Sequence, residues 1–252
     1  MDTPLSVLRA SVGRLHDMVS GLSDAQLSSP SYCDDWSIAQ VLSHLGSGAV
    51  IARRGLQDAQ AGTSTPEDFN TSVWDEWNAK APRAQADDAL KADAALMEAY
   101  DAVDEDERAQ LVFPLGPLSL GFDELVGLRL NEHTFHSWDI AVMLDEAARL
   151  PGDATALVVD NLALIARFSA RPEGQARTIA VRTTDPGRAV ALRLAADGVE
   201  LGGGETGQQP DLELPAEAFC RLVYGRLDPD HPPAFTGDPA LVSGLRAVFP
   251  GP

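Results

Sequence analysis

The segment LRLNEHTFHSWDI, residues 128–140, gathers several side chains that can bind a metal ion. On a helix of about 3.6 residues per turn, four of its polar residues recur at steps of three or four and share one face. These residues are Arg129, Glu132, His136 and Asp139. Glu132 and His136 are one turn apart, so a carboxylate oxygen and an imidazole nitrogen can reach the same cation, as in helical zinc motifs. The segment therefore predicts two ligands of a metal site, and a solvated charged helix face is the alternative.

His44 is the strongest candidate for the third ligand that such a site needs. It lies on the apolar face of another expected helix, beside Val41 and Leu45, and Gly48 leaves space next to it one turn further on. The face that carries Glu132 should also point into the protein, because it is flanked by Leu125, Leu128, Ile140 and Met143. Buried imidazoles and carboxylates are costly unless they are paired or bound to a metal. Taken alone, His44 would be a core histidine bonded to a carbonyl; beside the other two residues it predicts a metal ligand.

The other histidines are weaker candidates. His133 follows Glu132 directly and lies about 100° further round the helix, so it would be a ligand only in place of His136. His16, at the margin of an apolar stripe, is expected to be a core histidine with satisfied hydrogen bonds. His231, in DPDHPP, is expected in a surface loop.

Four long amphipathic helices are expected to position these residues. The first opens at Thr3-Pro4, and the second begins at Ser37, which forms a capping box with Gln40, and runs to about Gln60. Trp36 and Val41 are placed for a hydrophobic staple across that start. A third apolar series spans residues 90–103, and a Pro/Gly-rich turn at 113–121 precedes the fourth helix, which reaches about Asp145. The pattern predicts a four-helix bundle with no strand before residue 140.

The periodicity of the apolar residues changes after Pro151, from mainly helical to partly alternating. A helix near 153–169 is followed by alternating segments at 176–185 and 189–203, the latter with an Asp-Gly turn typical of a hairpin. Residues 212–227 predict a strand followed by a helix, and residues 237–249 a closing helix. The sequence therefore predicts an α+β fold with two domains, a helical bundle at 1–150 and a small α+β domain at 151–252.

Composition excludes several classes of protein. The hydrophobic fraction of 44% and the charged fraction of 23% are typical of a globular chain, and a net charge of −19 argues against nucleic-acid binding. No apolar run approaches the roughly 20 residues of a membrane helix, and no signal peptide is evident, so we expect a cytoplasmic protein that does not bind membranes. Cys33 and Cys220 form no CxxC pattern. Cys33 is either a reactive thiol or a small half-buried residue in a turn.

Residues 35–49, DWSIAQVLSHLGSGA, and 129–139, RLNEHTFHSWD, together resemble the metal-binding signature of the mycothiol-dependent maleylpyruvate isomerase family, one of the DinB-like four-helix-bundle metalloenzymes. FCRLVYGRLDP and FTGDPALVSGLRAVF resemble the smaller C-terminal domain of that family, which is akin to sterol-carrier folds. The resemblance implies that His44, Glu132 and His136 bind a divalent metal. Zinc is preferred, and iron(II) and nickel suit the same donors. Arg129 and Asp139 then either support the ligands or form a plain salt bridge between helix turns.

Three protein ligands leave a coordination position open, which is typical of a catalytic zinc site. A thiol that binds there would ionise and become a nucleophile. The resemblance implies that this thiol is mycothiol, bound between the two domains and used for isomerisation or S-transfer. Arg221 and Arg226 are candidates for binding a small anionic substrate, or else surface residues. Metal-assisted hydrolysis and a non-catalytic metal or thiol sensor remain alternatives, and the protein is expected to be a monomer or homodimer.

Overall fold

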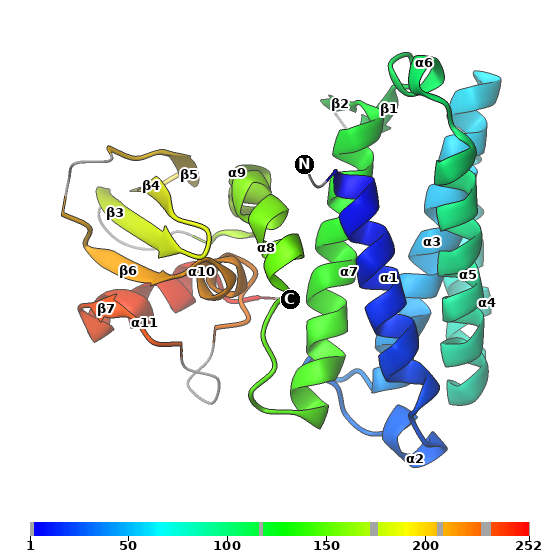
Figure 1. Cartoon of the computed structure of the whole chain (residues 1–252), viewed down its shortest axis with the longest axis horizontal. Coiled ribbons are helices and arrows are strands. Elements are labelled where there is room, and N and C mark those ends of the chain that lie inside the picture. Colours follow the sequence, from blue (N-terminus) through cyan, green and yellow to red (C-terminus); the bar gives the residue numbers. More distant parts are fainter. Residues whose placement is uncertain (1–2, 116–117, 172–175, 206–208, 228–232, 252) are drawn as a thin grey trace. The chain divides into compact units, whose positions relative to one another are not determined.

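The computed structural model in Figure 1 describes residues 3–115, 118–171, 176–205, 209–227 and 233–251. The chain divides into two compact units, Met1–Ala148 and Arg149–Pro252, which we call the N-terminal and C-terminal units. No helix in the described part of the chain combines the length and apolar character needed to cross a bilayer.

The N-terminal unit is a helical bundle. Four long helices lie side by side in Figure 1, with α1 in contact with α5 and α7, and α3 in contact with the same two helices. The elements of this unit are α1 (Pro4–Ser20), α2 (Asp24–Leu27), α3 (Ile38–Ala61), α4 (Phe69–Asn78), α5 (Pro82–Ala102), α6 (Glu105–Arg108), β1 (Phe113–Leu115), β2 (Leu118–Leu120) and α7 (Phe122–Leu144). The four predicted long helices are α1, α3, α5 and α7.

Local signals set where these helices begin and end. Thr3 caps α1, with Pro4 as its first residue. Ser37 and Gln40 form the predicted capping box of α3, with Gln40 N donating to Ser37 Oγ at 3.2 Å and Ser37 N donating to Gln40 Oε1 at 2.8 Å. Gly62 ends α3 in the left-handed region at φ +64°, where glycine carries no steric penalty. Short-range side-chain chemistry therefore explains the helix boundaries that the sequence predicts.

The expectation that no strand precedes residue 140 is wrong. β1 and β2 form a two-stranded antiparallel ladder in which Phe113 pairs with Leu120 and Pro114 pairs with Ser119. Phe113 and Leu120 are buried, whereas Pro114 is exposed. A proline is tolerated in an edge strand because its missing N–H can face solvent. The proline and glycine content of this segment predicts only a turn, but the segment contains the short β1–β2 ladder before α7.

The close packing of α3 on α5 depends on Gly46. A Cβ atom at this position would lie 2.8 Å from the Cα of Ala89 on α5 and would also clash with the Trp77 indole. Real Cβ atoms do not approach other atoms so closely, so only glycine fits here. Apolar residues of α3 and α5, including Leu42, Leu45 and Ala86, fill the core around this contact.

The C-terminal unit is built around a five-stranded sheet in the order β5-β4-β3-β6-β7, in which β3 and β6 are parallel and the other pairs antiparallel. Its elements are α8 (Gly152–Val158), the 3₁₀ helix η1 (Val159–Asn161), α9 (Leu162–Ser169), β3 (Arg177–Thr184), β4 (Arg188–Ala195), β5 (Gly198–Gly203), β6 (Leu212–Pro215), α10 (Ala216–Val223), β7 (Thr236–Gly237) and α11 (Pro239–Val248). The predicted hairpin at Asp197-Gly198 is present, because Ala195 pairs with Gly198 across it. The single helix predicted near 153–169 is instead broken by η1.

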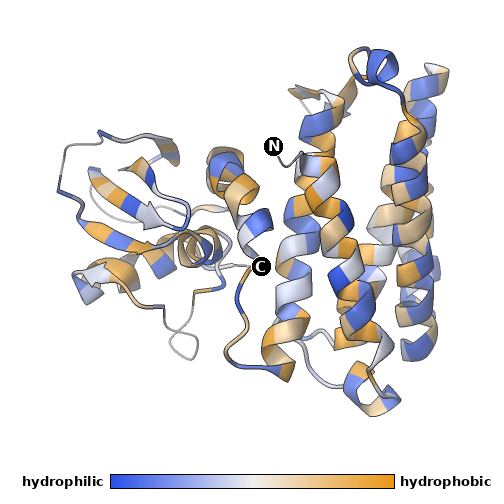
Figure 2. Cartoon of the chain, in the orientation of Figure 1, coloured by the Kyte–Doolittle hydropathy of each residue, from blue (hydrophilic) through white to orange (hydrophobic). Residues whose placement is uncertain are grey.

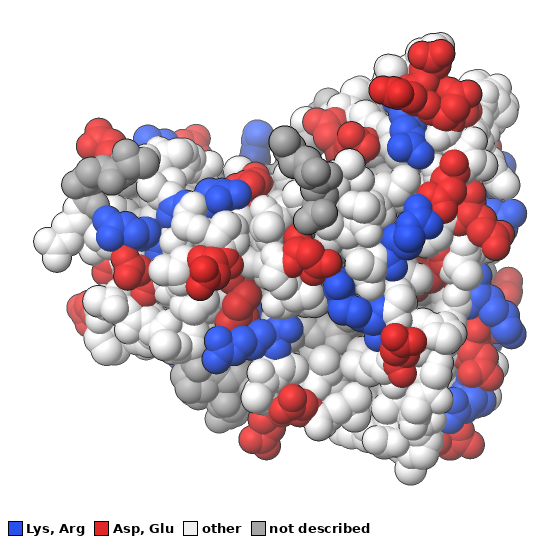
Figure 3. Space-filling model, viewed as in Figure 1, with Lys and Arg blue, Asp and Glu red and all other residues white. Residues whose placement is uncertain are grey.

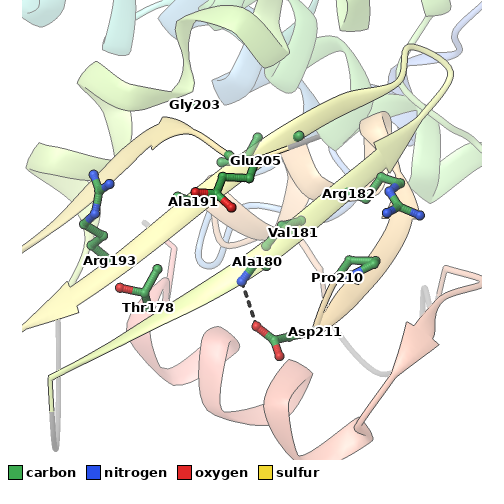
Figure 4. Close-up of a pocket in the computed structure, with 13 residues that line it drawn as sticks. Thr178, Ala180, Val181, Arg182, Ala191, Arg193, Gly203, Glu205, Pro210 and Asp211 are labelled. Atoms are coloured by element: carbon green, nitrogen blue, oxygen red, sulfur yellow. Dashed lines mark hydrogen bonds between the residues drawn. The ribbon is translucent and has the colours of Figure 1, made fainter. Parts of the chain in front are cut away.

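One face of this sheet carries a hollow of about 310 Å³, shown in Figure 4. Its lining includes the small side chains of Ala180 and Ala191 and the charged side chains of Arg193 and Glu205. Asp211 Oδ2 accepts a hydrogen bond from Ala180 N at 2.8 Å and closes one edge. The buried residues of β3 alternate with these polar and small ones, so this is the solvated face of a sheet covered on its other side.

Hydropathy and charge follow this architecture. Figure 2 shows apolar residues interspersed with polar ones along the bundle helices and along the strands, as expected for elements with one buried side. Acidic side chains are prominent on the face in Figure 3, and one cluster lies at α6, which contributes Glu105, Asp106 and Glu107. The charge of −19 is therefore carried on the surface, where water screens it.

Candidate functional site

Three potential metal ligands converge where α3 and α7 meet. His44 Nε2 on α3 lies 3.0 Å from Glu132 Oε2 on α7, and His136 Nε2 lies 3.7 Å from the same oxygen. The two imidazole rings are 4.6 Å apart between centroids. One donor atom from each of the three residues lies within 4.8 Å of the other two. Two imidazole nitrogens and one carboxylate oxygen in this arrangement can surround one divalent cation.

The site lies at the rim of the bundle and not in its core. The side chain of Glu132 is 48% exposed, whereas that of His136 is 13% exposed. The prediction that this face of α7 points uniformly inward is therefore wrong: Arg129 and Asp139 are buried, but Glu132 and Met143 are exposed. A helix face is wider than one contact line, so residues at its edges reach solvent while those at its centre do not.

Glu132 is held in its ionised form. Burial of part of the carboxyl group opposes ionisation, but the hydrogen bond from His44 and the charges of His136, His44 and Arg129 outweigh it and lower the pKa of Glu132 to about 2. The carboxylate is therefore negatively charged at neutral pH, as a metal ligand must be.

Asp139 orients His136 from behind. Its buried Oδ2 atom lies 2.8 Å from His136 Nδ1 and accepts a hydrogen bond from the Cys33 thiol at 3.1 Å. A proton on His136 Nδ1 is assigned from this geometry, and it places the lone pair of the ring on Nε2, the nitrogen near Glu132 and the one that would coordinate a cation. A carboxylate bonded to the far nitrogen of a histidine is the usual support of a metal ligand.

The loop before α3 is fastened to α7 at the same place. Tyr32 N donates to Asp139 O at 3.0 Å, and the Tyr32 ring meets Trp138 edge-on at 4.8 Å between centroids. Cys33 lies in this loop and is buried, not half-buried as one of the two expectations had it. A second group of possible ligands, formed by Cys33, His136 and Asp139, therefore shares His136 with the first.

A buried polar network lies on the inner side of α7. His133 is 0% exposed, and its Nε2 lies 3.1 Å from Asp93 Oδ2 on α5 while its Nδ1 lies 3.1 Å from Ser11 Oγ on α1. Arg129 Nη2 donates to Asp93 Oδ1 at 2.8 Å and to Leu45 O at 2.7 Å. Burial opposes ionisation of Asp93, but His133 and Arg129 outweigh it and lower the pKa of this carboxyl group. His133 is thus occupied by the network, which accounts for its absence from both ligand groups.

Asp93 and Ser11 are the residues that sequence reasoning missed. The available signal is that Asp93 lies three residues after Leu90 and three before Leu96, on the buried stripe of α5. Gly48 also has a different role from the expected one. A Cβ at Gly48 would lie 2.9 Å from Arg129 Nη1, so this glycine makes room for the arginine and not for His44.

A comparison with known families finds a match to the mycothiol maleylpyruvate isomerase N-terminal domain over residues 8–141, more than half of the chain. The chain belongs to the mycothiol maleylpyruvate isomerase family. All three converging ligand candidates lie within the matched residues. The prediction of the family from its two sequence segments is thereby confirmed.

Solved structures of the family extend the likeness to the whole fold. The crystal structure of the mycothiol-dependent maleylpyruvate isomerase aligns with a TM-score of 0.66 at 15% identity and covers 94% of this chain and 96% of that one. The crystal structure of a histidine-to-alanine mutant of such an isomerase aligns with the same score at 14% identity. The α+β fold class is confirmed, and the protein to which family and fold are matched is an enzyme. None of the curated proteins compared with the chain matches it.

The two arginines proposed to bind substrate lie in the C-terminal unit. Arg221 and Arg226 are both buried in the C-terminal unit, so the alternative that they are surface residues is wrong. Arg221 Nε donates to Glu217 Oε2 at 2.8 Å, and Arg226 Nη1 donates to Tyr224 O at 3.0 Å. Their predicted role in substrate binding stays a prediction.

Two histidines complete the comparison with the sequence-based predictions. The expectation of a core histidine at position 16 is wrong, because the His16 side chain is 61% exposed and lies 3.6 Å from Asp17. His16 is one residue beyond the buried Leu15 and so turns away from the stripe. His231 lies outside the described residues.

Proposed function

We propose that the protein is a metal-dependent enzyme that binds a divalent ion, with zinc preferred, through His44, Glu132 and His136 and activates a low-molecular-weight thiol there. Mycothiol is the proposed thiol, and isomerisation or S-transfer is the proposed reaction. The observation that carries the proposal is the convergence of the three donor groups from two helices. Membership of the mycothiol maleylpyruvate isomerase family supports the identity of the thiol.

The residues present fit a metal of this kind. The set combines one anionic carboxylate with two imidazoles, and it leaves room for a further ligand because a three-residue set does not fill a tetrahedral zinc. When bound, such a metal lowers the pKa of a thiol that coordinates it, which makes the thiol a nucleophile at neutral pH. Iron(II) and nickel suit the same donors, so the donor set supports a divalent metal more strongly than zinc in particular.

Each residue of the site has a definable task in this chemistry. Glu132 supplies negative charge, because its pKa is held near 2 by its histidine neighbours and Arg129. Asp139 keeps the proton of His136 on Nδ1. Arg129 and His133 share the carboxylate of Asp93 and so fix the rotation of α7, on which the direction of Glu132 depends.

The proposed reaction of an isomerase type needs no net redox change. The thiol sulfur adds to an activated carbon–carbon double bond, rotation occurs about the resulting single bond, and expulsion of the thiol restores the double bond. In S-transfer the new carbon–sulfur bond is kept and the neighbouring carbon takes up the proton that the thiol lost. An anionic substrate would need a cation, and we retain Arg221 and Arg226 as candidates.

The metal site is tested by comparing two histidine-to-alanine variants. His44→Ala should lose tightly bound divalent metal in elemental analysis, because it removes one of three donors. His16→Ala is the matched control, since His16 is an exposed histidine of the same bundle, and it should keep the metal content of the parent protein. Equal metal content in the two variants would refute the proposed ligand set.

Thiol dependence is tested by calorimetry on the metal-loaded protein. Mycothiol should bind, and binding should be lost when the metal is removed by a chelator. If no binding is detected at millimolar mycothiol, metal-assisted hydrolysis or a sensing role replaces the thiol proposal.

A further inference from the structure

Trp36 is an exposed aromatic residue at the candidate metal site. The residue is 37% exposed, although tryptophan is usually well buried. The indole lies against both histidines of the site, at 5.5 Å from the His44 ring and 6.4 Å from the His136 ring between centroids. The indole and His136 planes are inclined by only 24°, so the two rings are nearly parallel. One side chain thus covers part of two proposed ligands and still presents surface to solvent.

The backbone holds Trp36 firmly in this position. Trp36 N donates to Cys33 O at 3.1 Å, and Trp36 O accepts from both the backbone nitrogen and the hydroxyl of Ser31 at 2.8 Å. Asp35, immediately before it, has a φ of +62°, a left-handed conformation that non-glycine residues adopt infrequently. Such local strain persists only where surrounding contacts impose it, and it is often found at functional sites. The loop therefore holds the indole in a fixed position against the two histidines.

The indole of Trp36 favours particular kinds of ligand group. An indole offers a flat apolar face and one N–H donor, and no described residue accepts a hydrogen bond from Trp36 Nε1. The two residues directly before Trp36, Asp34 and Asp35, are both exposed and acidic. A negatively charged group beside the indole would be repelled, whereas a flat uncharged group would pack on it.

We propose that Trp36 contacts the ligand of the metal site and selects thiols and substrates that carry a flat, uncharged group next to the reacting sulfur or carbon. The inference rests on the proposed thiol-binding function and adds a selectivity residue to it. It also predicts that any carboxylate of the substrate lies at the end of the molecule remote from Trp36. The residue is a binding residue, since it acts by direct contact with the ligand and not through the metal.

The test uses the full chain loaded with Co²⁺ as a coloured probe and two thiols, phenylmethanethiol and 2-mercaptoethanol. Binding is followed by the sulfur-to-cobalt absorption band, so the readout is affinity and not activity. The parent protein should prefer phenylmethanethiol, and Trp36→Leu should reduce that preference about fivefold, because aromatic pairs contribute roughly 0.5–1.5 kcal/mol beyond the burial that leucine retains. Trp36→Phe should keep most of the preference. Trp74→Leu, which changes an exposed tryptophan of α4, should keep all of it.

The outcomes separate this inference from the function on which it rests. If both thiols bind and the preference in Trp36→Leu stays within about twofold of the parent, Trp36 is not a selectivity residue and the thiol site stands. If neither thiol changes the cobalt spectrum of the parent protein, the thiol function itself fails.

Should Trp36→Leu fail to fold, tryptophan emission decides the question. Phenylmethanethiol should change the emission of the Co²⁺-loaded parent and leave that of Trp36→Phe unchanged. An equal change in both proteins would overturn the inference.

Discussion

Replacing Asp93 by alanine is expected to destabilise the bundle substantially. Asp93 is 2% exposed and accepts hydrogen bonds from two basic side chains, Arg129 at 2.8 Å and His133 at 3.1 Å. Its removal leaves a buried guanidinium whose remaining described partner is Leu45 O. Breaking a buried ion pair from one side costs about 3–5 kcal/mol, and the contact with Leu45 favours the lower end. For a unit of this size that corresponds to a fall in melting temperature of roughly 6–12 °C.

The assay is thermal and urea unfolding of the full chain, followed by helical circular dichroism of the bundle transition. Asp88→Ala is the matched control, because Asp88 lies on the same helix and pairs with Lys80 and Lys91 near the surface. Partly exposed pairs contribute about 0–1 kcal/mol, so this control should unfold close to the parent protein. A cost below about 1 kcal/mol for Asp93→Ala, or equal costs for both variants, would refute the reasoning.

The Asp93 ion pair should also make the stability of the bundle depend on pH. The pKa of Asp93 is lower in the folded protein than its ordinary value of 3.8, so the unfolded chain takes up the proton first as pH falls. The stabilisation is therefore complete above pH 3.8 and is lost as pH falls below it toward the folded pKa. The difference in stability between the parent and Asp93→Ala should be constant near neutral pH and shrink in that acidic range. A difference that grows on acidification would have the wrong sign.

Three further outcomes are expected. Asp139→Asn should weaken divalent-metal affinity by about 10–100-fold in a chelator competition, because His136 loses its supporting carboxylate; unchanged affinity would remove Asp139 from the site. Gly46→Ala should destabilise the bundle by about 1–3 kcal/mol through overpacking against α5, whereas Gly55→Ala, whose Cβ would meet nothing within 4 Å, should be neutral or slightly stabilising in the same urea titration. The proposed domains, 1–150 and 151–252, should be separated by limited proteolysis between about residues 145 and 153, and cuts confined to the termini would contradict independent folding.

Much of the site could be predicted because its geometry is local. Glu132 and His136 are one helical turn apart, so their common face follows from the period of the helix alone. Ser37 and Gln40 likewise mark the start of α3 through a capping box that spans three residues. The position of His44 on the partly buried side of α3 then follows from the same helical period. These predictions need no knowledge of what packs against either helix.

The errors arise where the three-dimensional surroundings of a residue, which its own sequence segment does not reveal, decide its role. The ribbon of β1 and β2 depends on cross-strand pairing, which the Pro/Gly-rich composition hides. Gly48 makes room for Arg129, a residue on another helix. Arg221 is buried with Glu217 as its partner, although an arginine in a helix end ordinarily suggests the surface. In each case the environment of the residue, and not its type, sets its role.

By itself the sequence determined the four long helices, the starts of α1 and α3, and the residue spacings that make a metal site possible, because these depend on interactions within one or two turns. Only the tertiary structure decided the rotation of α7. This helix has buried residues on several sides, so its apolar pattern does not single out one inward direction. Asp93 on α5 and Ser11 on α1 hold His133 inside, and Asp139 and Cys33 hold His136 at the rim. A buried ionic or polar group must find its partner, and that requirement selects the rotation that brings Glu132 and His136 to His44.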